Sequence, residues 1–328
     1  MKTLDLIIPC FNEEESLLLF YQETDKVART MPDYRFHYIF VNDGSRDGTL
    51  EIMRRLAAEH PEVSYLSFSR NFGKEAAMYA GFRHSTGDLA AVMDADLQHP
   101  PTLLPAMAAG IEEGYDCCAA CRSSREGEGK LRSFFSSVFY RFSNHFTEVK
   151  LPQNAVDYRM MTRQMLNAVL ELAESERFSK GIFAWVGFET KWIPYSNVER
   201  LAGASKWSVR GLLHYAVSGI ASFSVKPLTA VRNMGIFLFA ASLLYALILL
   251  IRVCCGADIP GNASVLCLLL FLGGILELSV GVVGEYVARI YQEAKDRPLY
   301  ILKESNLPMI PSGAARPADT DREDTSHD

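Results

Sequence analysis

The chain has 328 residues, a formal net charge of −6 and 22% charged residues. This length suits one large domain with an appendage, and the absence of a net positive charge argues against nucleic acid as a partner. The apolar run at residues 4–9 is too short for a secretion signal, so we expect the first domain to stay in the cytosol. The seven cysteines lack zinc-like spacing, which favours reduced, buried thiols.

Short apolar runs alternate with helical patterns through the first half of the chain. The predicted strands cover residues 4–9, 36–42, 63–68 and 88–93. The predicted helices cover about 13–30, 48–60, 74–85 and 101–113. This alternation predicts an α/β domain with a parallel sheet and helices on both faces. Because ligands of such sheets bind beyond the carboxyl ends of the strands, the polar residues that follow each strand are the candidates for a site.

Two acids, Asp94 and Asp96, follow the fourth predicted strand. Carboxylates two residues apart at a strand end can hold a hard divalent cation, and Mg²⁺ prefers one or two carboxylates together with substrate phosphates. A cation there would stabilise the charge of a diphosphate leaving group. The sequence therefore predicts a Mg²⁺ or Mn²⁺ site, with an exposed turn that caps a helix as the alternative.

A second polar cluster, residues 42–49, follows the second predicted strand. Asp43 is placed to accept hydrogen bonds from a nucleobase, and the glycines of this cluster allow close backbone approach. The alternative is a plain turn in which Asp47 caps the next helix. The sequence has neither a dinucleotide-binding glycine fingerprint nor a P-loop.

The second half of the chain carries signals of a membrane. Basic and aromatic residues interleave over about 125–148, and a less basic stretch covers 207–225. Both are typical of helices that lie on a membrane surface, although helices that pack aromatic residues against a core show the same sequence pattern. Two apolar segments, about 234–251 and 263–283, approach or reach the roughly 20 residues that cross a bilayer.

Cations flank these two segments, and the positive-inside rule places both ends of the hairpin in the cytoplasm. The flanking cations are Lys226, Arg232, Arg289, Lys295 and Arg297. We therefore expect a catalytic domain over 1–228, a two-helix transmembrane hairpin over 229–290, and a cytoplasmic, largely disordered tail over 291–328.

Several motifs resemble those of family-2 glycosyltransferases with the GT-A fold, a Rossmann-like, mostly parallel α/β domain. They lie at residues 7–14, 41–49, 70–75 and 93–101. Downstream motifs at 157–159, 178–181, 185–188 and 205–207, with the two apolar segments, narrow the resemblance. They are similar to the polyprenyl-phosphate (bactoprenol) glucosyltransferases, with dolichol-phosphate mannose synthase as a more distant relative.

The resemblance implies roles for residues that match the family motifs. The nucleotide-sugar would contact Pro9, Phe11, Glu13, Asp43, Lys74, Asp94, Ala95, Asp96 and Gln98. The catalytic residues would be Asp96, Asp157, Arg200 and Lys206, and the metal ligands Asp94 and Asp96. Lys74 is the first residue of a predicted helix, so a structural role in packing at the helix start is an equal alternative to contact with the nucleotide-sugar.

Cations near the acceptor are expected to hold its phosphate through charge-assisted hydrogen bonds. The candidates are Arg122, Arg125, Lys130, Arg200 and Lys206. The first three would also fit a solvated or lipid-facing basic patch. A phosphate monoester has a second pKa of about 6 and is largely deprotonated at neutral pH, so Asp157 is either a base or an orienting group.

These features predict an inverting, metal-dependent hexosyltransferase that moves a sugar, with UDP-glucose as the first candidate donor, to polyprenyl phosphate. Alternative sugars are GlcNAc, galactose, mannose and formyl-aminoarabinose. A processive polysaccharide synthase would need further membrane helices and a Gln-x-x-Arg-Trp motif, and neither is present in the sequence. A scaffold that binds the donor without turnover would not need Asp94 or Asp96. We expect a multi-pass protein of the bacterial inner membrane that forms a homo-oligomer.

Overall fold

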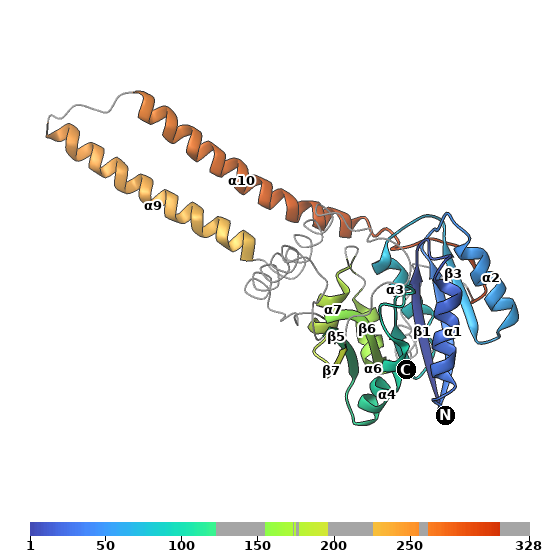
Figure 1. The fold of residues 1–328 in the computed structure, drawn as a ribbon. Helices are drawn as coiled ribbons and strands as arrows, with labels where there is room; N and C mark the ends of the chain where they lie inside the picture. The colour runs from blue at the N-terminus through green and yellow to red at the C-terminus, as the bar shows by residue number, and fades with distance from the viewer. Residues whose placement is uncertain (123–154, 173, 175–176, 196–225, 256–261, 309–328) are drawn as a thin grey trace, which may run out of the picture.

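A computed structural model describes residues 1–122, 155–172, 174, 177–195, 226–255 and 262–308 of the chain. The described residues form an α/β domain around one eight-stranded sheet with the order β7-β5-β6-β4-β1-β2-β3-β8. Two long helices, α9 (Lys226–Cys254) and α10 (Asn262–Ala294), project together away from this domain (Figure 1).

The parallel half of the sheet confirms the strand–helix alternation predicted from the sequence. Its strands are β1 (Lys2–Cys10), β2 (Tyr34–Asn42), β3 (Val63–Phe68) and β4 (Leu89–Val92), which pair in parallel in the order β4-β1-β2-β3. The helices that follow them are α1 (Leu17–Ala28), α2 (Thr49–Glu59), α3 (Lys74–His84), η1 (Pro101–Leu103) and α4 (Leu104–Glu112). All four strands therefore direct their carboxyl ends to one edge of the sheet.

Alternating side chains of β1 build the core on both faces of the sheet. Leu4, Leu6 and Ile8 are fully buried in the cluster that includes residues of α1, α2 and α4. Ile7 is buried in a second cluster with Met78 and Phe82 of α3 and with residues of α6 (Arg163–Glu171) and α7 (Ser179–Trp185). The result is a three-layer α/β/α domain whose sheet is covered on both faces.

Three further strands that were not predicted extend the sheet beyond β4. They are β5 (Cys117–Arg122), β6 (Ala155–Thr162) and β7 (Thr190–Tyr195). β6 runs antiparallel to β4, with Val92 opposite Arg159. Two residues further toward the carboxyl edge of the sheet, this register brings Asp94 level with Asp157.

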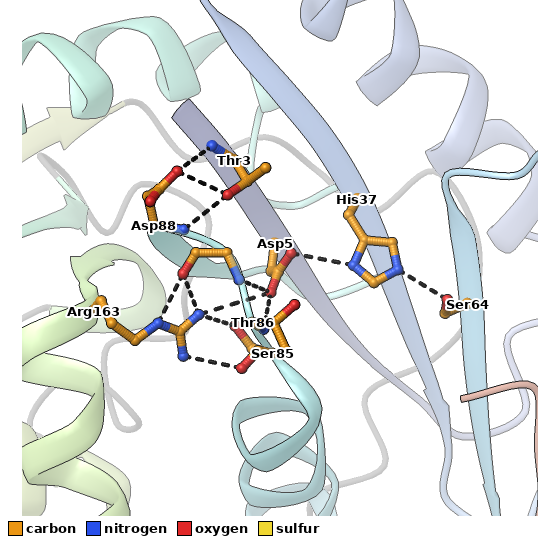
Figure 2. Close-up of polar contacts among 9 residues, drawn as sticks. Thr3, Asp5, His37, Ser64, Ser85, Thr86, Asp88 and Arg163 are labelled. Atoms are coloured by element: carbon orange, nitrogen blue, oxygen red, sulfur yellow. Dashed lines mark hydrogen bonds and ion pairs between the residues drawn. The ribbon is translucent and has the colours of Figure 1, made fainter. Parts of the chain in front are cut away.

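A polar network around the buried Asp5 joins β1, β2 and the residues before β4, at the amino-terminal edge of the parallel strands (Figure 2). The Asp5 carboxylate is 2% exposed and accepts hydrogen bonds from the backbone N–H groups of Thr86 at 2.6 Å and Gly87 at 2.7 Å. His37 of β2 contacts it through Nδ1 at 3.2 Å. Arg163 donates from the other side to the Gly87 carbonyl. Because every buried acceptor of Asp5 is satisfied, this network fixes the positions of β1, β2 and β4.

After α10 the chain returns to the sheet as β8 (Leu302–Ser305), which pairs antiparallel with β3. Tyr300, just before β8, is 1% exposed and stacks on Phe68 with 5.1 Å between ring centroids. The expectation of a largely disordered tail from residue 291 is therefore wrong for this segment. The backbone hydrogen bonds and the aromatic burial offset the entropy of ordering it. Residues 309–328 lie outside the described chain.

One stretch in the described residues, Phe271–Ala294 within α10, is long and apolar enough to cross a membrane by length and composition. A second crossing helix stays a prediction. The two expected surface helices, 125–148 and 207–225, lie outside the described residues.

Candidate active site

Three charged side chains meet at the carboxyl edge of the sheet. Lys74 is the first residue of α3, Asp94 follows β4, and Asp157 lies in β6. The Lys74 ammonium lies 2.6 Å from Asp94 Oδ1, 2.9 Å from Asp94 Oδ2 and 2.8 Å from Asp157 Oδ2. The sheet register thus joins two acids 63 residues apart through a lysine supplied by a third element.

This arrangement sets the charge of each group. Burial alone would raise the pKa of Asp157, but the positive charges of Lys74 and Lys180 outweigh it and hold the pKa well below its ordinary value. Lys74 likewise keeps the pKa of Asp94 below its usual range against the effect of burial. Both acids are therefore carboxylates at neutral pH, and Lys74 is charged.

Neighbouring side chains hold this cluster in place. The Arg159 guanidinium, buried at 3% exposure, lies over the Phe183 ring at 3.8 Å and donates to the backbone carbonyls of Val156 and Asp157. On α3, Glu75 accepts hydrogen bonds from the backbone N–H of Ser179, at 3.1 Å, and from its hydroxyl. These contacts fix β6 and the start of α3 relative to each other.

The acid pair lies on a tight turn after β4. Asp96 Oδ1 accepts a hydrogen bond from the Gln98 backbone N–H at 3.1 Å, and Ala95 between the two acids is buried. Leu97 has a φ of 56°, in the left-handed region that bulky residues rarely adopt. Backbone strain of this kind is concentrated at functional sites, where the surrounding structure maintains it.

His99 closes the base of this turn. Its ring is almost fully buried and lies 5.5 Å from the Tyr158 ring and 6.2 Å from the Tyr195 ring. Its Nδ1 is 3.8 Å from Asp94 Oδ2 and has no hydrogen-bond partner within the described residues. An unsatisfied buried nitrogen beside a carboxylate is unusual in a folded protein. The His99 nitrogen is therefore a polar group at this turn that a ligand could contact.

The donor atoms of the turn fit a hard divalent cation. Asp94 and Asp96 supply carboxylate oxygens, which Mg²⁺ and Mn²⁺ both accept. Among the residues that the structure describes, no group of three acidic, histidine or cysteine side chains forms a complete metal cage. An ion bound here would therefore take its remaining ligands from substrate phosphate and water.

Asp43, predicted to face a nucleobase, makes a different contact. Its carboxylate is 3% exposed and accepts hydrogen bonds from the backbone N–H groups of Phe72 at 2.6 Å and Gly73 at 2.9 Å. Burial raises the pKa of Asp43 to about 6 although both hydrogen bonds act to lower it. Asp43 thus anchors the loop that leads into α3 and Lys74, and a nucleobase contact stays a prediction.

A glycine allows these two loops to meet. Gly44 has a φ of +66°, and a Cβ added there would lie 2.4 Å from the carbonyl carbon of Arg70 and 2.6 Å from the nitrogen of Asn71. Only glycine fits such a close backbone approach at a positive φ. Gly44 is therefore part of the reason why Asp43 can reach the start of α3.

The loop after β1 joins the same edge of the sheet. The Asn12 N–H donates to Ser45 Oγ at 2.9 Å, and the Glu13 N–H donates to Thr49 Oγ1 at 2.8 Å. Pro9, the next-to-last residue of β1, lies opposite Val41, and Phe11 is half-buried just beyond the strand. The predicted nucleotide-binding residues of β1 and β2 thus share one edge of the sheet with the acid pair.

Of the predicted acceptor cations, only Arg122 lies within the described residues. It ends β5 and donates through Nε to the Tyr195 hydroxyl at 3.3 Å. Tyr195 in turn contacts His99, so Arg122 borders the site. The remaining predicted cations lie outside the described residues; they are Arg125, Lys130, Arg200 and Lys206.

Sequence reasoning missed part of the site. The sequence predicts no role for His99 and no contact between Glu75 and Ser179. Arg159 carried no assigned role. The adjacency of His99 to the acid pair was the one local signal, whereas the other contacts depend on how α3, α7 and β6 pack.

Comparison with known proteins shows the family to which the chain belongs. Residues 5–170 match the family model described as glycosyl transferase family 2. The chain is 44% identical over 306 residues to the protein CsbB of Bacillus subtilis (strain 168), covering 93% of this chain and 92% of that one. It is 39% identical over 301 residues to the bactoprenol glucosyl transferase of Shigella phage SfX, covering 92% and 98%.

A third relative, the prophage bactoprenol glucosyl transferase homolog of Escherichia coli (strain K12), is 38% identical over 301 residues, with 92% of this chain and 98% of the relative covered. Each of these alignments spans almost the full length of both proteins. The chain belongs to glycosyl transferase family 2 and is a glycosyltransferase.

Proposed function

We propose that this glycosyltransferase moves a hexose from a nucleotide-sugar, with UDP-glucose as the first candidate, to polyprenyl phosphate at the cytoplasmic face of a membrane. The observation that carries the proposal is the contact of one ammonium, that of Lys74, with both Asp94 and Asp157. It brings the acid assigned to the donor diphosphate next to the acid assigned to the acceptor. The names of the bactoprenol glucosyl transferase relatives support this acceptor class.

In the proposed reaction, an oxygen of the lipid phosphate attacks C1 of the sugar from the face opposite the diphosphate. The bond between C1 and the diphosphate oxygen breaks, and its electron pair leaves with the nucleoside diphosphate. The sugar becomes bonded to the lipid phosphate with its anomeric configuration inverted. Because the acceptor phosphate is already largely deprotonated at neutral pH, no strong base is needed.

The charge of Asp157 fits an orienting role in this scheme. A carboxyl group whose pKa is held well below its ordinary value has little tendency to take a proton. Its oxygens remain hydrogen-bond acceptors for Lys74 and for donor hydroxyl groups. We therefore assign Asp157 to positioning and not to proton removal.

Cations of the chain would compensate the phosphates of both substrates. Asp94 and Asp96 are the residues that would hold Mg²⁺ or Mn²⁺, which supplies positive charge for a diphosphate leaving group. Arg122 borders the site and is the described candidate for the acceptor phosphate. Arg125, Lys130, Arg200 and Lys206 complete the proposed set.

A membrane anchor suits an acceptor whose phosphate lies at headgroup level. The apolar stretch Phe271–Ala294 supports such an anchor, and α9 is proposed as the second crossing helix. The cations after α10 favour the cytoplasm for the catalytic domain. We further propose a multi-pass protein of the bacterial inner membrane that forms a homo-oligomer.

The test is a panel of donors offered to membranes that contain the protein and undecaprenyl phosphate. UDP-glucose, UDP-galactose, UDP-GlcNAc, GDP-mannose and UDP-linked formyl-aminoarabinose would be compared by mass spectrometry of the lipid product. The Asp94→Asn and Asp96→Asn variants are expected to lose transfer by about 10²-fold or more. Product formation that is undiminished in both variants would reject the metal assignment, and the absence of a lipid-linked sugar with every donor, formyl-aminoarabinose included, would reject the acceptor.

A further inference from the structure

The Lys74 ammonium donates hydrogen bonds to Asp94 Oδ2 and Asp157 Oδ2, and it forms an ion pair with Asp94 Oδ1. A lysine ammonium has three donors, and three acceptor oxygens lie between 2.6 and 2.9 Å from Nζ. Two of them are the two oxygens of Asp94, so the ammonium straddles that carboxylate. The third belongs to Asp157. Lys74 thus neutralises one of the two charges that these acids bring together.

The backbone of Lys74 is held firmly while its side chain is the adjustable part. Asp43 accepts the N–H groups of Phe72 and Gly73, directly before Lys74. Glu75, directly after it, accepts from Ser179. A four-carbon side chain on a fixed backbone can exchange partners without movement of the sheet.

A divalent ion at Asp94 would compete with this ammonium. An ion that binds through both carboxylate oxygens would occupy the place of Nζ, and an ion on one oxygen would lie close to a positive charge. At such distances the repulsion between a divalent ion and an ammonium is large even in a high dielectric. Metal binding at the free site is therefore opposed by Lys74.

We propose that Lys74 is an exchangeable counter-ion that couples metal binding to donor binding. It holds Asp94 and Asp157 together in the free enzyme, and it releases Asp94 when a metal arrives with a diphosphate, because the phosphate oxygens then provide new acceptors for the ammonium. Lys74 is a positioning residue in this role. The inference rests on the proposed function only through the assignment of the metal to Asp94.

If Lys74 opposes metal binding, removal of its positive charge should increase the affinity for Mn²⁺. The full chain in detergent would be titrated with Mn²⁺, and free Mn²⁺ would be measured by electron paramagnetic resonance, with and without UDP. Lys74→Met should bind Mn²⁺ about tenfold tighter than the wild type without UDP. The increase in Mn²⁺ affinity on adding UDP, present in the wild type, should become at least about threefold smaller in Lys74→Met.

Two controls separate the proposed coupling from general charge effects. Lys74→Arg keeps the positive charge and should stay within about threefold of the wild type. Lys191→Met removes an ammonium that pairs with Glu113 on the outer part of the sheet, and it should leave Mn²⁺ affinity unchanged. Unchanged or weaker Mn²⁺ binding by folded Lys74→Met would overturn the inference.

A second variant keeps the inference testable if Lys74→Met does not fold. Asp157→Asn leaves Lys74 paired with Asp94 alone, so Mn²⁺ binding without UDP should weaken about threefold or more. Equal or tighter binding by this variant would contradict the proposed competition. These titrations do not require sugar transfer. A failure to find a lipid product would therefore reject the proposed function without affecting the interpretation of the Mn²⁺ titrations.

Discussion

Glu304 of β8 accepts two hydrogen bonds from the guanidinium of Arg54 in α2, at 2.8 and 2.5 Å, across 250 residues of sequence. The Tyr65 hydroxyl donates to the same carboxylate at 2.6 Å. The Arg54 guanidinium holds the pKa of Glu304 at about 2, so this contact persists throughout the neutral range. The segment that follows the apolar helix α10 is therefore an integral part of the catalytic sheet.

Tyr300 is the apolar anchor of that segment, and its removal should destabilise the catalytic domain. We expect Tyr300→Ala to lower the free energy of unfolding by about 3 kcal/mol, because it leaves a cavity against Phe68. The measurement is the urea midpoint of the full chain in detergent, followed by tryptophan fluorescence. Ile301→Ala, at a side chain that is 50% exposed, is the matched control and should change stability by less than about 0.5 kcal/mol. Equal losses in both variants would contradict the anchoring role.

Asp5 should stabilise the fold in a pH-dependent manner. Burial acts to raise its pKa, but the hydrogen bonds from His37, Ser85 and Gly87 overcome it and hold the pKa below the ordinary 3.8. A lowered pKa in the folded state means that the stabilisation is complete above pH 3.8 and is lost as the pH falls through the folded pKa. Asp5→Asn should therefore lower the free energy of unfolding by about 1–3 kcal/mol at pH 7, and the difference from the wild type should shrink below about pH 4.

Urea unfolding at a series of pH values checks this dependence. Glu59→Gln, at an exposed position, is the control and should follow the wild type at every pH. A constant difference between Asp5→Asn and the wild type from pH 7 down to 3 would rule out the ionised carboxylate as the source of the stabilisation.

The sequence predicted the parallel half of the sheet and missed the rest for a physical reason. β1 to β4 each contain a short, mostly apolar run, which is the local signature of buried parallel strands. β5 consists mainly of cysteine and alanine, and β6 carries Asp157 and Arg159 in its interior, so neither shows that signature. β8 is a short polar strand whose existence depends on pairing with Leu66 and Ser67, far away in the chain.

The candidate site was likewise predicted only in part. The acid pair was predicted because both acids directly follow one strand. The contact of Lys74 with Asp157 depends on the register of β4 against β6, which no local pattern records. Asp43 illustrates the limit of motif reasoning, since its residue type suits a nucleobase as well as the backbone N–H groups that it contacts in the fold.

The close approach at Gly44 predicts a joint loss of stability and donor binding. Gly44→Ala would place a Cβ 2.4 Å from the Arg70 carbonyl carbon at a φ of +66°, so the loop before Lys74 must shift. We expect a loss of about 1–3 kcal/mol in the free energy of unfolding and at least about tenfold weaker UDP binding by calorimetry. Gly114→Ala is the control, because its φ is +104° but nothing lies within 4 Å of the added Cβ. It should lose stability without a change in UDP affinity; weaker UDP binding in this control as well would point to general destabilisation.

The low pKa of Asp157 predicts how transfer depends on pH. Lys74 and Lys180 outweigh the effect of burial and keep this carboxyl group ionised well below neutrality. In wild type, the rate should rise through about pH 6 as the acceptor phosphate loses its second proton. Asp157→Asn should lower the transfer rate by about 10²-fold through lost positioning, and the rise near pH 6 should remain, because it belongs to the acceptor. The measurement is the rate of lipid-product formation from about pH 5 to 9, with Asp33→Asn at an exposed position as the control. A general base would give another result: the rise near pH 6 would move or disappear in Asp157→Asn.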